Sequence, residues 1–448
     1  MQTETLDRLR SRVAAQREKI PEIYGRVDFS IVPERFAGDV GATSVLPGKF
    51  AAARAALLAD ADRVAFIRNY SMMGDPAADA YAALMREHGF RRLVGMLVQA
   101  CDAGVETVAD APRELVALIR DMERTPAWLD MKLVEQGARI DRNGAANLSP
   151  FLIRGAFLAT FMNKYAALPM AITNALSSNS SARRVKETAT FFATSVLPGA
   201  LGRFGPGFKA AAMVRLMHSM VRANVMRRAD NWDIAVYGIP IPQVDQMPAG
   251  LIPIFLLAQK VLSEGRTQFT AEERARVELA RYRCFLLGLP EDLLSDTPQG
   301  IVDLMVLRSA TLRAGYDDKT CGELVRATMA ATLRPDESLR SRLFETFERS
   351  FAKLFFVNSF LNGDRARAAS IGVPITAGDR ALTALVGAFL FSRVALYRLA
   401  SRIPGLRGIA DRRLVRRIQN LLKDYGHAEF TTDASAYRPA QPSVAKST

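Results

Sequence analysis

The sequence predicts an all-α protein that folds as one large helical domain. Apolar residues recur at the three- and four-residue spacing of an α-helix along almost the whole chain, and hardly any segment alternates like a half-buried strand. No glycine-, serine- or proline-rich linker of useful length interrupts the chain before about residue 428. We therefore expect one domain over 45–428, preceded by a helical extension at 1–44. The polar, proline-containing tail at 429–448 is expected to be disordered.

Several expected helices begin with local signals of their own. Asp75 and Thr125 each stand directly before a proline, which suits an N-cap side chain followed by proline at the first helical position. Thr270 and Glu273 have the spacing of a capping box. The helical segments run near 48–59, 77–88, 92–104, 112–123, 150–176, 182–196, 207–229, 249–263, 271–286, 299–313, 320–332, 337–360, 379–400 and 410–423.

Charge and cysteine usage narrow the function classes. The chain has 60 Lys+Arg against 46 Asp+Glu, a formal charge of +14, but its arginines are spread among apolar residues without interleaved aromatics or a recognition-helix pattern. Nucleic acid is therefore not an expected partner. Cys101, Cys284 and Cys321 show no disulfide or metal-ligand spacing, which predicts packing residues in a reducing compartment. The charged N-terminus lacks the apolar run of a secretory signal, so we expect a cytoplasmic protein.

Two C-terminal segments bear on membranes. The apolar run at 381–391 is closed by Arg393 and is shorter than the roughly twenty residues that cross a bilayer, so it is expected to form a buried helix. The basic segment 407–423 carries arginines beside Ile409, Val415 and Ile418. It is either a solvated helix face or a peripheral contact with acidic phospholipid.

One histidine stands out among the three in the chain. His218 lies within a long apolar helix, and helical spacing places Arg215 and Arg222 on its own side. An imidazole with two cations beside it suits haem, which needs one nitrogen ligand for iron and cations for its propionates. The alternative is a histidine satisfied within the core. His88, at a helix end, and His427, near the tail, are expected to be structural.

A second helix carries a polar stripe. Arg184, Glu187 and Thr188 fall within one turn, and Phe191 continues the same side, so this helix could roof a cofactor. The alternative is an ordinary charged amphipathic helix. Candidates for the lining of a pocket for an oily ligand are Phe151, Phe157, Phe161, Met162, Phe191 and Phe192.

Taken in order, several blocks resemble the family of latex-clearing proteins and MpaB-type oxygenases over roughly residues 45–425. The blocks are Gly74-Asp75-Pro76-Ala-Ala-Asp79, Thr125-Pro126-Ala-Trp128-Leu-Asp130, Arg184 with Thr188, Arg215-x-x-His218-x-x-x-Arg222, Asn231-Trp232, and Gly238 to Asp245. The resemblance implies an all-α domain with a globin-like core that binds b-type haem.

The resemblance also implies roles for single residues. His218 would be the proximal iron ligand, and Arg215 and Arg222 would either orient its helix or meet the propionates. Arg184 and Thr188 match the distal pair of the family. The implied function is a haem-dependent oxygenase that oxidises or cleaves an apolar terpenoid, prenyl or fatty acyl substrate with O₂. The alternative is a non-catalytic haem- or lipid-binding protein of the same fold.

The sequence also departs from this family. Its rubber-cleaving members carry a lysine three residues after the distal arginine and an acidic residue upstream. Here Glu187 stands in the lysine's place, and residues 155–176 contain no Asp or Glu. Lys186 lies about 200° around the helix from Arg184 and is expected to point away. The acid/base groups of polyisoprene cleavage are therefore either absent or rebuilt around Glu187.

Overall fold

The computed structural model of the chain is built from helices. It describes residues 3–173, 178–227, 232–334 and 336–426. Within these residues, extended pairing is limited to two isolated bridges, Phe36 with Leu312 and Ser44 with Arg313, and no strand forms. The predicted all-α fold class is confirmed. The expected disordered tail at 429–448 lies outside the described residues.

The first helices span the N-terminal region and the segments that lead to the candidate distal helix. They are α1 Thr3–Ala14, α2 Gln16–Lys19, α3 Pro21–Tyr24, α4 Arg54–Ala59, α5 Ala61–Tyr70, α6 Pro76–Ala83, α7 Met85–His88, α8 Phe90–Ala103, α9 Arg113–Glu123, α10 Met131–Asn147, α11 Ser149–Ala159 and α12 Lys164–Ile172.

The remaining helices include the two that carry the candidate site. They are α13 Ser178–Thr194, α14 Pro206–Arg227, α15 Ile234–Tyr237, α16 Gln243–Ser263, α17 Ala271–Leu286, α18 Pro298–Thr311, α19 Glu323–Ala330, α20 Leu339–Phe360, α21 Arg365–Ser370, α22 Ala377–Arg402 and α23 Pro404–Asp424.

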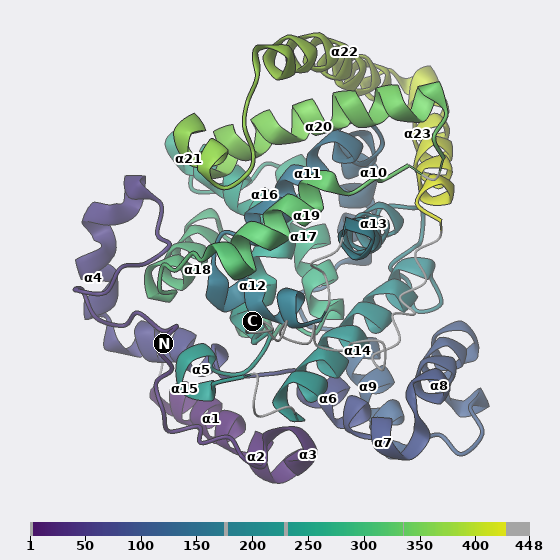
Figure 1. Cartoon of the computed structure of the whole chain (residues 1–448). Coiled ribbons are helices and arrows are strands. Elements are labelled where there is room, and N and C mark those ends of the chain that lie inside the picture. The colour runs from purple at the N-terminus through teal and green to yellow at the C-terminus, as the bar shows by residue number, and fades with distance from the viewer. Residues whose placement is uncertain (1–2, 174–177, 228–231, 335, 427–448) are drawn as a thin grey trace, which may run out of the picture.

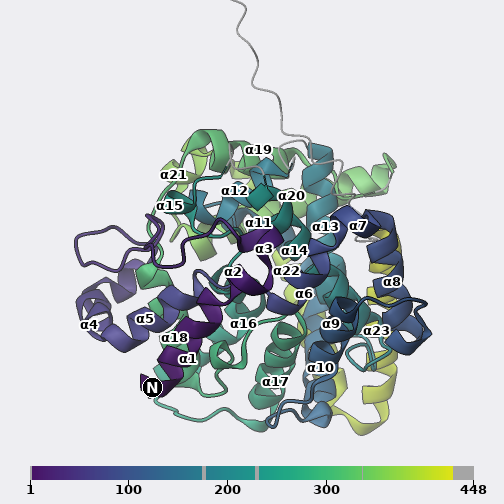
Figure 2. The same ribbon diagram turned by 90° about the horizontal axis from the view of Figure 1, so that it is seen from below.

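The helices of the described residues pack around one large apolar cluster, with smaller apolar clusters beside it. Figure 1 shows α20 and α22 along one end of the molecule and α1 to α3 at the opposite end, with α14 among α6, α8 and α9. The view from below places α10 beside α17, and these two helices pack along each other (Figure 2). Gly137 makes this packing close, because a side chain there would meet the Ala275 carbonyl. The core thereby joins helices that lie far apart in sequence.

Two of the predicted helix starts are confirmed and one is wrong. Asp75 accepts the Ala78 N–H at the start of α6, and Thr270 with Glu273 forms the capping box of α17. No helix begins at Thr125: α9 ends before it, and α10 begins six residues later with Asp130 as its cap. The intervening segment is fixed by tertiary contacts, because the Trp128 indole donates to Glu291 at 2.9 Å.

The single helix expected over 150–176 is divided in two. α11 ends at Ala159, and Asn163 then caps α12 by accepting the Tyr165 N–H at 3.0 Å. The same asparagine donates to the Arg313 carbonyl at 2.8 Å. This bond to a distant part of the chain favours the break over a continuous helix.

The prediction of a buried helix at 381–391 is wrong. α22 continues to Arg402, and it is the one helix of the described residues that is long and apolar enough to cross a membrane, by length and composition. Only 17% of its apolar stretch is buried, and Phe389 and Phe391 are both more than half exposed. The short apolar run is therefore part of a longer helix on the surface.

The predicted packing role of the cysteines is confirmed. Cys101, Cys284 and Cys321 are free and buried. Burial raises the pKa of Cys101 and of Cys284 to about 12 and that of Cys321 to about 11. These thiols are protonated at physiological pH and serve as packing residues.

Candidate site on the His218 helix

The candidate site is built on α14, which lies in the core. Its arginines at 215 and 222 are 4% and 0% exposed, although a guanidinium is among the groups that cost most to bury. His218 and Met217, by contrast, are only partly buried. The helix therefore needs partners for two charges, whereas residues 217 and 218 keep a small part of their surface accessible.

Two aspartates from α6 and its cap supply these partners. Arg215 donates from Nε and Nη2 to the Asp75 carboxylate at 2.5 and 2.9 Å, and Nη2 also reaches Asp121 at 2.5 Å. Arg222 is paired with Asp79 and donates to the Pro240 and Ile241 carbonyls. The two aspartates of the Gly74–Asp79 block thus hold the His218 helix in place.

A tyrosine at the end of α3 completes this charge cluster. Tyr24 donates its hydroxyl to Asp79 at 2.6 Å. Burial, and then the Asp79 charge, raise the pKa of Tyr24, so the hydroxyl remains a donor. A side chain at Gly74 would collide with this hydroxyl, which explains why glycine stands there.

A relay of two glutamines fixes the proton on His218. Gln243 donates from Nε2 to the Gly74 carbonyl at 2.7 Å, and its Oε1 accepts from Gln246 Nε2 at 3.0 Å. Gln246 Oε1 then lies 3.2 Å from His218 Nδ1. The Gly74 carbonyl can only accept a hydrogen bond, so the Gln243 amide must turn its NH2 group toward it and its oxygen toward Gln246. The Gln246 amide is oriented in the same way, so its oxygen faces His218 and Nδ1 must be the donor. The lone pair is thereby left on Nε2, the nitrogen that can bind a metal.

The imidazole is also kept neutral. Burial lowers the pKa of His218 to about 4, and the charges of Arg222 and Arg184 act in the same direction. The hydrogen bond to Gln246 opposes these effects but is outweighed. His218 is therefore a neutral imidazole at physiological pH, which is the form that binds metals.

The distal helix α13 faces the His218 helix. Arg184 is buried, and its Nη1 lies 3.0 Å from Met217 Sδ and 3.4 Å from Glu187 Oε2. Glu187 is 2% exposed and also accepts from Arg183 Nε at 3.1 Å. The Arg184 side chain thus reaches the neighbour of His218, as its predicted position on the inward face requires.

The other residues of this helix fall on the expected sides. Thr188, one turn after Arg184, is partly buried. Lys186 lies where Glu345 and Arg334 act on it, and burial lowers its pKa. The prediction that Lys186 points away from Arg184 is supported by these neighbours. Glu187 and not Lys186 therefore shares the inward face with Arg184.

The other histidines and the candidate pocket residues do not join the His218 site. His88 ends α7, with Nε2 at 3.8 Å from Glu87, and His427 and Asn231 lie outside the described residues. Among the described residues, no three His, Cys, Asp or Glu side chains gather as a metal site. The candidate lining residues do not form one cluster: Phe151, Phe161 and Phe191 belong to three different apolar clusters, and Phe157 and Met162 pack against that of Phe161.

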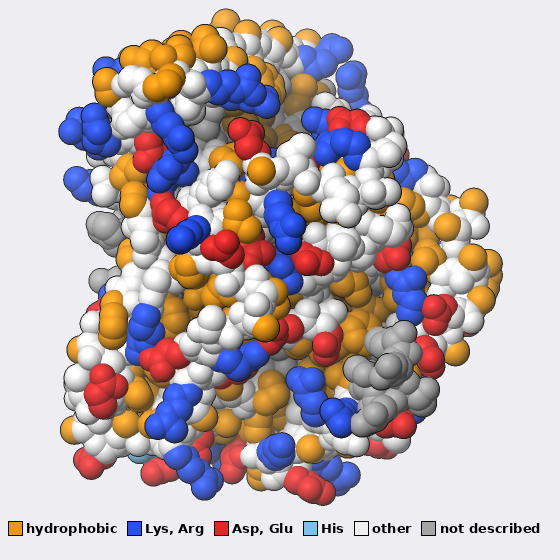
Figure 3. Space-filling view, turned by 180° about the vertical axis from the view of Figure 1, so that it is seen from behind, with side chains coloured by type: hydrophobic (Ala, Val, Ile, Leu, Met, Phe, Trp, Pro, Cys, Tyr) orange, Lys and Arg blue, Asp and Glu red, His pale blue; other side chains and the backbone are white. Residues whose placement is uncertain are grey.

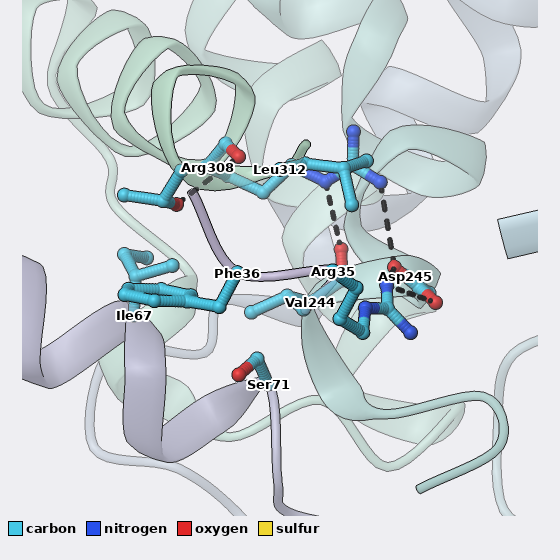
Figure 4. Close-up of a pocket in the computed structure, with 9 residues that line it drawn as sticks. Arg35, Phe36, Ile67, Ser71, Val244, Asp245, Arg308 and Leu312 are labelled. Carbon is cyan, nitrogen blue, oxygen red and sulfur yellow. Dashed lines mark hydrogen bonds and ion pairs between the residues drawn. The ribbon is translucent and has the colours of Figure 1, made fainter. Parts of the chain in front are cut away.

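The loop before α16 is held by two side chains at the start of that helix, Gln243 and Asp245. Gln243 bonds the backbone, at Gly74, but Asp245 binds two arginines instead, Arg35 at 2.6 Å and Arg308 at 3.5 Å. Figure 4 shows these side chains beside a crevice that includes Phe36. The crevice has room for about one water molecule, so it does not suit an organic substrate.

Comparison with known proteins decides the family. Residues 142–393 match the model described as "ER-bound oxygenase mpaB/B'/Rubber oxygenase, catalytic domain", which is more than half of the chain. The chain belongs to this oxygenase family. The match covers α13 and α14 and therefore both halves of the candidate site.

The fold agrees with this assignment. A solved structure titled "Structure of Latex Clearing Protein LCP in the closed state" matches with a TM-score of 0.55, covering 79% of this chain and 91% of that one. The sequences are 15% identical, so this match supports the fold alone. The curated proteins contain no significant match.

Sequence reasoning missed the partners of the predicted residues. The sequence gives Gln246 no predicted role, and it predicts Asp75 only as a helix cap and Asp79 only as part of a motif. A signal was present for the aspartates, since two arginines inside an apolar helix require carboxylates. For Gln246 there was only its place three residues after Gln243, on the same face of a helix.

We expect Asp79→Ala to lower the free energy of unfolding by about 3–5 kcal/mol, because it leaves the Arg222 charge buried without its carboxylate. Urea unfolding measures the change. Asp102→Ala is the matched control, because it removes a partner of Lys209 in an exposed ion pair, and it should cost at most about 1 kcal/mol. Equal effects of the two changes would contradict the proposed importance of the buried pair.

A pH dependence of the free energy of unfolding follows from the lowered pKa of His218. The unfolded chain protonates His218 near its ordinary pKa of 6.5, but the folded chain does so only near about 4. Between these values the unfolded state binds more protons at His218, so the contribution of this residue to stability rises with pH from about 4 to 6.5 and is complete above that range. The full effect is about 3 kcal/mol.

Urea unfolding across this pH range tests the assignment. His218→Gln should remove this contribution from the pH profile of stability, and the control His88→Gln should retain it. A His218 variant whose stability follows the wild-type pH profile would show that another group titrates.

Proposed function

We propose that this protein is a haem-dependent oxygenase that acts on an apolar substrate. The observation that carries the proposal is the glutamine relay, which turns the one imidazole of α14 into a donor at Nδ1 and a free ligand at Nε2. The chain's membership of an oxygenase family supplies the reaction class.

The donor set suits haem better than a bare ion. A single imidazole provides one bond, whereas bare transition metals need several protein ligands. In haem the porphyrin supplies four nitrogens, so one axial histidine is enough. The chain has no cysteine pair suited to covalent attachment, which favours a b-type haem. The chemistry supplied by such a group is electron transfer and O₂ activation at iron.

The arginines of α14 would act chiefly by positioning His218. All three donor nitrogens of Arg222 are bonded to Asp79, Pro240, Ile241 or Ser219. Arg215 has one buried nitrogen, Nη1, without a partner among the described residues. Arg215 therefore keeps a donor for a cofactor carboxylate, while Arg222 fixes the helix.

The distal side chains would supply charge and a proton. Arg184 holds a fixed positive charge above the Met217–His218 turn, where it can donate to negative charge that develops at the reacting centre. Glu187, bonded to Arg183 and Arg184, would accept or release a proton at its carboxylate. The Thr188 hydroxyl, one turn from Arg184, would hold a water molecule or relay a proton by donating and accepting hydrogen bonds.

The substrate we propose is a terpenoid, prenyl or fatty acyl chain. The family's description names a rubber oxygenase, which acts on an apolar polymer. Glu187, in the lysine's place, argues for chemistry other than polyisoprene cleavage. We place the protein in the cytoplasm, because its three thiols are free. The competing proposal is a haem or lipid carrier that consumes no O₂.

Haem binding should depend on His218 and its relay. We expect the haem-supplemented wild type to show a Soret band, His218→Ala to lose it, and Gln246→Leu to bind haem about ten- to a hundredfold more weakly. Visible spectroscopy with haem titration measures both effects, and His88→Ala is the control that should match wild type. A colourless wild type, or an unchanged band in His218→Ala, contradicts the proposal.

The rate of turnover should depend on Glu187, whereas haem binding should not. Glu187→Gln should retain the haem spectrum and lose about a hundredfold or more in rate, because it removes a group that exchanges protons. O₂ consumption with a lipid extract under reducing conditions, followed by mass spectrometry of the lipids, measures the rate. Lys186→Gln is the matched control on the other side of the helix. Full activity of Glu187→Gln removes Glu187 from the mechanism, and a pigmented but inactive wild type favours the carrier.

A further inference from the structure

The surface of α22 is apolar along most of its length. The exposed apolar side chains of α22 and of its C-cap residue form what we call the α22 apolar face: Leu385, Phe389, Phe391, Leu396, Leu399 and Ile403. Exposure within this set reaches 67%. Hydrophobic side chains gather along the upper edge of the molecule in Figure 3, where α22 lies, with Lys and Arg beside them. Such a continuous apolar surface marks a contact site.

The helix lies flat against the protein. Val386, Gly387 and Leu390 are buried, and α22 packs on α20, α23 and α10. Arg398 is exposed in the middle of the C-terminal half of the helix. A helix held along one side, with a charge in the apolar stretch, suits the plane of a membrane interface better than a crossing.

The charge of this region has one sign. No acidic residue occurs between Asp379 and Asp411, whereas Arg380, Arg393, Arg398, Arg402 and Arg407 all fall in that interval. All of these arginines except Arg393 are exposed. The Arg393 guanidinium lies 5.2 Å from the Phe389 ring centre, over the apolar face itself. The surface therefore combines apolar side chains with uncompensated positive charge.

This charge pattern favours a lipid surface over a second copy of the chain as the partner of the α22 apolar face. A second copy of the chain would bring the same arginines against each other, with no carboxylate in the interval to offset them. An anionic phospholipid surface offers phosphate groups for the arginines and an acyl boundary for the apolar side chains.

The basic helix α23 contributes less than its sequence suggested. Leu414, Ile418 and Leu422 are buried, and Arg417 donates to the Ala146 carbonyl at 2.8 Å. The apolar side of this helix thus belongs to the core. Arg412, Arg413 and Arg416 are exposed as a charged face.

We propose that the α22 apolar face docks on the surface of an anionic bilayer, with the helix axis parallel to the membrane plane. The exposed phenylalanines and leucines enter the headgroup–acyl boundary, and the arginines bind lipid phosphates. This surface is distinct from the His218 site, and its test does not require haem.

Vesicle flotation of the full chain tests the proposal. The wild type should float with phosphatidylcholine vesicles that contain phosphatidylglycerol, and only weakly with phosphatidylcholine alone. Phe389→Ser with Leu396→Ser should weaken binding about a hundredfold, at about tenfold per buried side chain. Arg398→Gln with Arg402→Gln should weaken binding to the anionic vesicles about fivefold per arginine.

The control replaces a Phe and a Leu that are equally exposed elsewhere. Phe204→Ser with Leu256→Ser removes side chains that are 64% and 58% exposed, and it should float like wild type. Wild type that fails to float, or α22 variants that float as well as the control, overturns the proposal. Sedimentation equilibrium is the second measurement: a wild-type dimer that Phe389→Ser with Leu396→Ser dissociates would also overturn it, since the occupant would then be a second copy.

Discussion

The pairing of two buried arginines with two aspartates is the constraint on which the candidate site depends. Arg215 and Arg222 lie two helical turns apart in α14, and Asp75 and Asp79 lie one turn apart at the start of α6. A buried guanidinium without its carboxylate costs several kcal/mol, so these helices can pack together only in the register that satisfies both pairs. The position of His218, between the arginines, follows from that register.

The ion pairs and the glutamine relay meet at one short segment of backbone. The Gly74 carbonyl accepts from Gln243, and its N–H donates to Gln16 at 2.8 Å, immediately before Asp75. The same backbone that sets the cap of α6 therefore sets the direction of the hydrogen bonds that end at His218. The N-terminal helices take part as well, through Gln16 and Tyr24. The backbone around Gly74 thus fixes both the pairing of the buried charges and the tautomer of the His218 imidazole.

The arginines of the candidate site and those of the α22 apolar face differ in burial and in charge pairing. In α14 the guanidiniums are enclosed and neutralised, which makes them rigid. On α22 they are exposed beside apolar side chains, without carboxylates in the same interval. The distal helix α13 contacts α23, which in turn packs on α22. The two surfaces are therefore joined through adjoining helices.

The sequence by itself determined the helical class, the helix that carries His218, the caps at Asp75 and Thr270 and the inward face of Arg184, because each of these depends on residues within a few positions. It could not determine which groups the inward residues meet. Asp79 lies 143 residues from Arg222, and Gly74 lies 169 residues from Gln243. It also misjudged 381–391, because an apolar run looks the same whether it faces the core or the surface. Only the packing of distant helices decided those partners, since burial and hydrogen-bond direction are properties of the assembled fold.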